Sequence, residues 1–124
     1  MPHPAFTCQV RVKYLPEQSS EPDGPFGFAY TVTISNTGDI TAQLVARHWI
    51  ITDARGGVEQ VRGLAVVGHQ PLLRPGESFE YTSGTRIGTP YGSMRGTFFC
   101  MTEDAEPFDA EVPEFQLVSP SQLH

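Results

Sequence analysis

The sequence predicts an all-β fold, built as one antiparallel β-sandwich of seven to eight strands. Three observations lead to this prediction: apolar and polar residues alternate with a period of two, Gly- and Pro-rich turns separate these segments, and helical periodicity is absent. The chain has 124 residues, of which 39% are hydrophobic and 18% charged. That length and composition are typical of a single globular domain, which we expect to span residues 1–124.

The first two strands are predicted from their alternation. Every second residue from Phe6 to Tyr14 is apolar, as expected for a half-buried strand, and the same pattern returns between Phe26 and Ile34. The intervening residues 15–25 are rich in Pro, Ser, Glu and Asp and predict a mobile loop. Turn-forming residues at 36–39 end the second strand.

A central strand is predicted between Leu44 and Thr52. This segment is apolar on both faces, which is typical of a strand covered on both sides. Val45, Trp49 and Ile51 would share one face, with Trp49 as the core aromatic residue. Residues 53–57 then supply the glycines that a hairpin requires, so residues 58–62 are expected to return antiparallel.

Turn chemistry divides the next part of the chain. Residues 73–77 contain Pro followed by Gly, which predicts a tight turn, and Ser78 to Thr82 alternates as a short strand. The stretch from Thr85 to Ser93 contains two glycines and a proline, and it predicts a second long irregular connection.

The last two strands are expected at Met94 to Met101 and at Phe108 to Leu117. Pro113 interrupts the second of these, which an edge strand or a bulge accommodates. Residues 118–124 are expected to form a frayed tail. Short strands, irregular connections and the lack of helices together predict an immunoglobulin- or fibronectin type III-like sandwich.

Charge and terminal sequence limit the classes of partner. A formal net charge of -6 and a pI near 5.0, with scattered arginines, argue against binding to nucleic acid or anionic lipid. The amino terminus lacks the features of a signal peptide and no segment is long enough for a membrane span, so we expect a cytoplasmic protein. Cys8 and Cys100 are expected to act as small hydrophobes, with a disulfide between them left open.

Residues 63–68 resemble a dinucleotide-binding fingerprint but lack its context. In that motif the glycines open a strand-to-helix turn, and the helix N-terminus holds the pyrophosphate. Pro71 and Pro75 exclude a helix here, and Ala65 replaces the middle glycine. We therefore interpret the segment as a loop or bulge between strands. Its backbone amides still leave an anion site open, provided that arginines converge on it.

The sequence predicts neither a catalytic nor a metal site. Ser83 lacks the flanking glycines of a hydrolase nucleophile and has no evident base beside it. The histidines and cysteines lack the spacing of a zinc site, and the acidic runs are typical of solvated surface. His69 lies in the glycine-containing loop and is the one histidine retained as a binding candidate. We expect no cofactor.

Several longer strings give the sequence a family resemblance. They are Arg47 to Asp53, Val61 to Pro71, Leu73 to Gly84, Gly92 to Gly96 and Phe108 to Phe115. Together, over nearly the whole chain, these strings are similar to the ApaG family. The resemblance implies a bacterial fibronectin type III-like sandwich without an established enzymatic activity, linked genetically to cobalt tolerance and magnesium efflux. Related domains in eukaryotic F-box and polymerase-delta-interacting proteins imply a protein-binding module.

These observations favour a non-enzymatic binding module whose partner is another, unidentified protein. The alternative is a small-anion site for pyrophosphate or a nucleotide in the loop 62–74, and a third hypothesis is direct binding of cobalt or magnesium. Exposed sheet edges leave both a monomer and a homodimer open. The candidate binding residues are Arg62, Gly63, Gly68, His69, Arg86 and Arg95.

Overall fold

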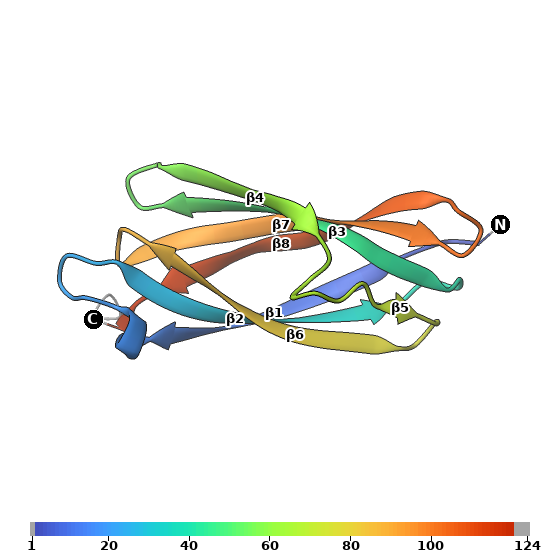
Figure 1. Ribbon diagram of the computed structural model, residues 1–124, viewed down its shortest axis with the longest axis horizontal. Helices are drawn as coiled ribbons and strands as arrows, with labels where there is room; N and C mark the ends of the chain where they lie inside the picture. The colour runs from blue at the N-terminus through green and yellow to red at the C-terminus, as the bar shows by residue number, and fades with distance from the viewer. Residues whose placement is uncertain (1, 121–124) are drawn as a thin grey trace.

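The structure, a computed structural model, describes residues 2–120 and confirms the antiparallel β-sandwich (Figure 1). Eight strands lie within these residues, together with one short 3-10 turn, η1 (Pro16–Gln18). The strands are β1 (Phe6–Leu15), β2 (Phe26–Asn36), β3 (Ala42–Asp53), β4 (Val58–Leu64), β5 (Leu72–Leu73), β6 (Ser78–Ile87), β7 (Tyr91–Thr102) and β8 (Pro107–Val118). None of the helical segments in this part of the chain has the length and apolar character needed to cross a membrane.

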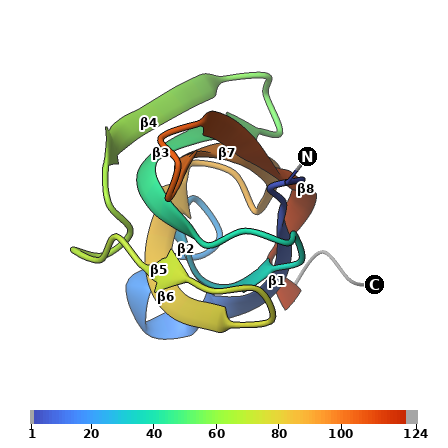
Figure 2. The same ribbon diagram turned by 90° about the vertical axis from the view of Figure 1, so that its right-hand side faces the viewer.

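The two sheets of the sandwich differ in width. The smaller sheet has the strand order β1-β2-β6, and the larger has the order β4-β3-β7-β8, with β5 paired to β3. β1 and β8 contact each other along one side of the sandwich. The larger sheet therefore extends beyond the smaller one on the opposite side, where β4 lies at the outer edge of the molecule (Figure 2).

Aromatic side chains from both sheets meet in the core around Trp49, which confirms its predicted role. Its ring centroid lies 5.5 Å from that of Tyr30 on β2 and 5.7 Å from that of Phe98 on β7. Gly96 on β7 leaves the space that the indole fills, because a Cβ atom there would lie 2.7 Å from Cζ3 of Trp49. Buried aromatic rings contribute a large part of the hydrophobic stabilisation in a domain of this size.

The prediction that Val45 shares the face of Trp49 is wrong. The register of β3 against β7 shifts between Leu44 and Ala46, which marks a β-bulge. One extra residue reverses the alternation of the strand, so Leu44 before the bulge and Trp49 after it both reach the core. Val45 lies at the bulge and stays outside the buried core.

The long irregular connection predicted from Thr85 to Ser93 is also wrong. β6 continues to Ile87 and β7 begins at Tyr91, so only residues 88–90 connect them. Gly84 lies inside β6, where it pairs with Ala29 of β2. The turn preference of Gly88 and Pro90 is satisfied within this short connection, and the residues on either side of it pair as strands.

Both explanations offered for Pro113 apply. β8 is an edge strand of the larger sheet, so one side of its backbone has no strand partner. Its register with β7 also shifts, so that Pro113 and Glu114 of β8 lie opposite the single residue Arg95 of β7, which makes a bulge at Pro113. The proline therefore removes no hydrogen bond from a regular ladder.

The predicted loop and tail contain some regular structure. Residues 15–25 include η1, and the Ser19 hydroxyl accepts a hydrogen bond of 2.9 Å from the amide of Gly27. At the other end, Val118 is still part of β8. Residues 121–124 of the expected tail lie outside the described residues. The mobility of the loop and the fraying of the tail stay predictions.

Candidate functional site

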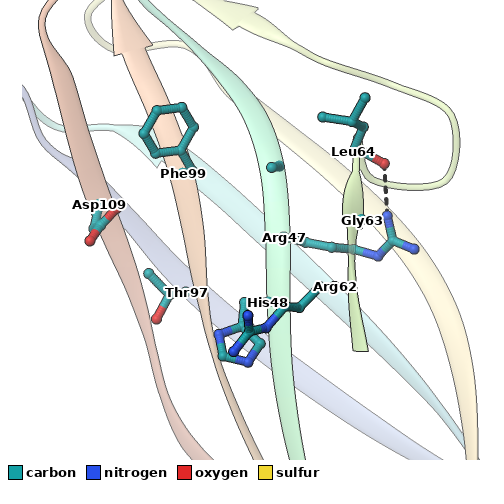
Figure 3. A pocket seen from close by; sticks show the side chains of 9 residues that line it. Arg47, His48, Arg62, Gly63, Leu64, Thr97, Phe99 and Asp109 are labelled. Atoms are coloured by element: carbon teal, nitrogen blue, oxygen red, sulfur yellow. Dashed lines mark hydrogen bonds between the residues drawn. The ribbon is translucent and has the colours of Figure 1, made fainter. Parts of the chain in front are cut away.

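A large hollow lies on the outer face of the five-stranded sheet, with a volume of about 660 Å³. Residues of β4, β3, β7 and β8 line it side by side (Figure 3). Its size lies within the range of pockets that bind ligands or the side chains of a partner. We therefore take this surface, which we call the outer-face hollow, as the candidate functional site.

Strand register builds the outer-face hollow as two rows of residues. In the first row, Ala46 of β3 pairs with Leu64 of β4 on one side and with Phe99 of β7 on the other. Phe99 in turn pairs with Asp109 of β8. These side chains point outward because successive residues of a strand alternate between its two faces and their neighbours face the core.

The first row forms an apolar floor. Leu64 is 72% exposed and Phe99 is 39% exposed, and both are among the large apolar residues left open to solvent. The small side chain of Ala46 lies between them in register, so the sheet is hollowed at this point. Several large apolar side chains exposed together on one face are typical of an interaction surface.

The second row is polar and crosses the sheet beside the first. His48 of β3 pairs with Arg62 of β4 on one side and with Thr97 of β7 on the other. Nε2 of His48 lies 2.8 Å from Oε1 of Gln60, and the same oxygen accepts a hydrogen bond of 3.3 Å from Arg62. The hollow thus has a basic side on β3 and β4, opposite the carboxylate of Asp109 on β8.

The side chain of Arg47 crosses under β4 at Gly63, as Figure 3 shows. Its Nη1 atom donates hydrogen bonds to the carbonyl oxygens of Leu64 at 2.8 Å and of Ala65 at 2.9 Å. A Cβ atom on Gly63 would lie 2.9 Å from the same nitrogen. The absence of a side chain at residue 63 therefore permits Arg47 to fix the end of β4.

Residues 65–69, which follow β4, form a tight hairpin turn. Val66 and His69 exchange two backbone hydrogen bonds of 2.8 and 2.9 Å, and Val67 and Gly68 between them have φ angles of +48° and +79°. Positive φ at both central positions is characteristic of a type I′ turn. The segment is thus a turn between strands, and the amides of residues 65, 66 and 69 already donate to backbone carbonyls.

The six predicted site residues lie in several places. Arg62 and Gly63 line the outer-face hollow, and Arg95 lines a smaller hollow of about 170 Å³ that shares His48 and Thr97 with it. Gly68 and His69 belong to the hairpin turn, where the His69 ring packs 5.5 Å from that of Phe79. Arg86 lies apart from them, in the cleft between the two sheets.

The titratable groups of the core are held in their neutral forms by burial. Burial raises the pKa of Cys8 and of Cys100 from 9.0 to about 12. Both cysteines are free thiols. Within residues 2–120, no group of three or more His, Cys, Asp or Glu side chains lies close enough together to hold a metal ion. The outer-face hollow offers apolar contact, hydrogen bonds and charge, which are means of binding.

Sequence reasoning missed most residues of the outer-face hollow. His48, Thr97, Phe99 and Asp109 come from three strands and meet only through register, which the sequence alone does not specify. One signal was present. Phe99 occupies a solvent-facing position of β7, in which the residues on the other face are buried. An aromatic residue at an outward position marks a surface that contacts something.

Comparison with known proteins gives a consistent result. Residues 16–102 match the family model described as the ApaG domain. The chain is 59% identical over 119 residues to Protein ApaG from Ralstonia nicotianae, an alignment that covers 96% of each chain. It is 57% identical over 126 residues to Protein ApaG from Acidovorax sp., covering 98% of this chain and 92% of the relative.

A crystal structure agrees with the sequence comparisons. The structure of the putative ApaA protein from Bordetella pertussis superposes with a TM-score of 0.91 at 52% identity. The superposition covers 94% of this chain and 95% of the other.

Proposed function

The chain belongs to the ApaG domain family, and on this premise we propose that it is a non-enzymatic protein-binding module. Its binding surface is the outer-face hollow. The observation that carries the proposal is the row formed by Leu64, Ala46 and Phe99, an apolar floor on a sheet face that nothing in residues 2–120 covers. Burying such a floor against a partner removes apolar surface from water and favours association.

The chemistry of the hollow defines the partner that fits it. An aliphatic or aromatic side chain placed over Ala46 would contact Leu64 on one side and Phe99 on the other. An acidic side chain beside it would lie near Arg62, on the basic side of the hollow. The proposed partner is therefore a protein segment that presents an apolar residue next to an acidic one.

We extend the proposal to the cobalt tolerance and magnesium efflux that the family resemblance implies. The partner would connect this chain to cobalt tolerance and magnesium efflux, and the chain itself would contribute recognition. The alternative of an anion site in the loop 62–74 has less support, because the amides of residues 65, 66 and 69 already have acceptors. The arginines Arg62 and Arg86 also line different hollows.

Affinity capture followed by measurement with the purified partner tests the proposal. The full chain is used to capture proteins from its native host, and binding of each captured protein is then measured by calorimetry. The Leu64→Glu variant should bind at least about tenfold more weakly, because it places a charge on the apolar floor.

A matched control lies on the same strand. Val58 is 61% exposed and lies at the far end of β4, outside the outer-face hollow. The Val58→Glu variant adds the same charge to the same edge strand and should bind within about twofold of the wild type. An equal loss of affinity in both variants, or an affinity that Leu64→Glu leaves unchanged, would show that the hollow is not part of the interface.

A further inference from the structure

A second cavity, between the two sheets, has no role in the proposed protein interaction. It has a volume of about 390 Å³ and opens on the side where β4 extends beyond the smaller sheet. β4 and β3 form one wall, and residues 83–86 of β6 form the other. We call this cavity the inter-sheet cleft. It lies where β4 of the larger sheet and β6, an edge strand of the smaller one, face each other across the open side of the sandwich.

Arg47 brings a positive charge to this cleft that has no carboxylate partner. Ion pairs in residues 2–120 join Arg11 to Glu80 and Arg74 to Glu77, and none includes Arg47. Its Nη1 atom is used by two backbone carbonyls, which fix the orientation of the guanidinium. Within residues 2–120 the hydrogen bonds of Arg47 all come from Nη1, which leaves Nη2 and Nε as a pair of parallel donors. Such a pair has the geometry that binds both oxygens of a carboxylate.

Two hydroxyl groups lie on the same cleft as this guanidinium. Tyr30 and Ser83 line the cleft with Arg47. Burial raises the pKa of Tyr30, and the Ser83 hydroxyl and the positive charge of Arg47 partly offset that effect. The three side chains are thus close enough to influence one another. The Ser83 hydroxyl also hydrogen-bonds to the Tyr30 phenol, so the two groups have one O–H left to donate beside the guanidinium, an arrangement that favours an oxyanion.

The remaining lining sets the charge and the shape of the ligand. Arg86 adds a second positive charge and Glu59 a negative one, so the cleft has one net positive charge. Val61 of β4, which is half-buried, supplies an apolar surface next to these groups, above the buried side chains of Trp49 and Met94. A singly charged anion with an apolar group attached matches both features, whereas pyrophosphate would bring excess negative charge close to Glu59.

We propose that the inter-sheet cleft binds a monocarboxylate, with the carboxylate held by Arg47, Tyr30 and Ser83 and an apolar tail lying against Val61. The ligand is either a free small acid or the terminal carboxylate of a peptide, since both present the same chemistry. This site is separate from the outer-face hollow, although Arg47 contributes to the lining of both.

Nuclear magnetic resonance titration of the full chain tests the proposal. Butyrate, 3-phenylpropionate and a dipeptide ending in phenylalanine are each added to about 10 mM, a concentration that detects binding with a millimolar dissociation constant. Saturable shifts are expected at the amides of residues 83–86 and at the indole of Trp49, the one tryptophan of the chain. The neutral 3-phenylpropionamide should bind at least about tenfold more weakly, because it lacks the charge. The acids and the dipeptide together distinguish a free ligand from a peptide terminus.

Variants on opposite walls locate the site. Arg47→Lys keeps the charge but loses the paired donors, so the affinity should fall about tenfold. Ser83→Ala and Arg86→Gln leave the bonds from Arg47 to the backbone intact and should each weaken binding about threefold. Arg62→Gln, on the outer-face hollow, is the matched control and should leave the affinity unchanged.

Three results would overturn the proposal. The first is the absence of saturable shifts with all three carboxylates. The second is equal binding of the neutral amide, and the third is a loss of affinity in Arg62→Gln as large as that in Ser83→Ala.

Discussion

The guanidinium of Arg47 occupies the space that a side chain at Gly63 would require. A Cβ atom on Gly63 would lie 2.9 Å from Nη1 and 3.1 Å from Nη2 of Arg47. Arg47 lies on β3 and Gly63 on β4, and they are directly paired in register. This relationship fixes the end of β4 and separates the outer-face hollow from the inter-sheet cleft, so changes at either residue should affect both.

The Gly63→Ala substitution should destabilise the chain through Arg47. The added methyl group displaces the guanidinium from the carbonyls of Leu64 and Ala65, and the free energy of unfolding should fall by about 1–2 kcal/mol. Urea denaturation measures this change. Gly88→Ala is the control, because no atom lies within 4 Å of a Cβ there.

A double-mutant cycle isolates the contact between the two residues. In an Arg47→Ala background, Gly63→Ala should cost no stability, because the group it displaces is gone. If Gly63→Ala lowers the free energy of unfolding equally in both backgrounds, its effect comes from the strand backbone, and displacement of Arg47 is not the cause.

The Gly96→Ala substitution should be the more damaging glycine replacement. Its methyl group would overlap the Trp49 ring and lie 2.9 Å from the backbone carbonyl of His48, and neither can move without disturbing the core. The free energy of unfolding should fall by about 3 kcal/mol. Gly84→Ala should change stability much less, because the nearest atom to a Cβ there would be the Phe28 carbonyl oxygen, at 3.5 Å.

The strands were predictable because their alternation is local, and the site was not because it depends on register. Phe6 to Tyr14 and Phe26 to Ile34 were found from period-two patterning, and the structure confirms both strands. Val45 was misplaced because a bulge reverses alternation without any local signal. The connection predicted from Thr85 to Ser93 was too long, because glycine and proline favour turns and only pairing with β2 shows that Thr85 and Arg86 belong to β6.

Residues 63–68 also show that the sequence predicted the absence of a helix but not the local turn. Pro71 and Pro75 correctly indicated that no helix follows Gly63. The type I′ turn was not predictable, because Val67 stands where the usual Asn-Gly signal has Asn and is a residue that disfavours positive φ.

Replacing Val67 with asparagine should therefore stabilise the hairpin turn. Val67 has a φ of +48°, which is unfavourable for a β-branched side chain, and it is 57% exposed, so little packing is lost. The Val67→Asn variant should gain about 1 kcal/mol in the free energy of unfolding. Val58→Asn, at an exposed strand position, should show no gain. A destabilised Val67→Asn would contradict the turn geometry.

Stability should fall at alkaline pH because of the buried thiols. Burial raises the pKa of Cys8 and Cys100 from 9.0 to about 12 in the folded chain. Above pH 9.0 the unfolded chain therefore loses these protons while the folded chain retains them, so the free energy of unfolding decreases as the pH rises towards 12.

Alkylation by iodoacetamide checks the same prediction directly. Near pH 9 both thiols should react slowly in the folded chain, since the thiolate is the reactive form. In the chain unfolded by urea, both should react as fast as free cysteine. Fast alkylation of Cys100 in the folded chain would contradict its burial.

Site-specific photo-crosslinking in the native host tests most directly whether the outer-face hollow binds a protein. A photoreactive residue replaces Leu64 or Phe99 in the hollow, and Val58 or Val12 outside it as controls. We expect positions 64 and 99 to yield the same discrete protein adduct, which the Arg62→Glu substitution weakens, and we expect none from positions 58 and 12. An adduct that forms from position 12 but not from position 64 would place the interface on the smaller sheet and contradict the proposed function.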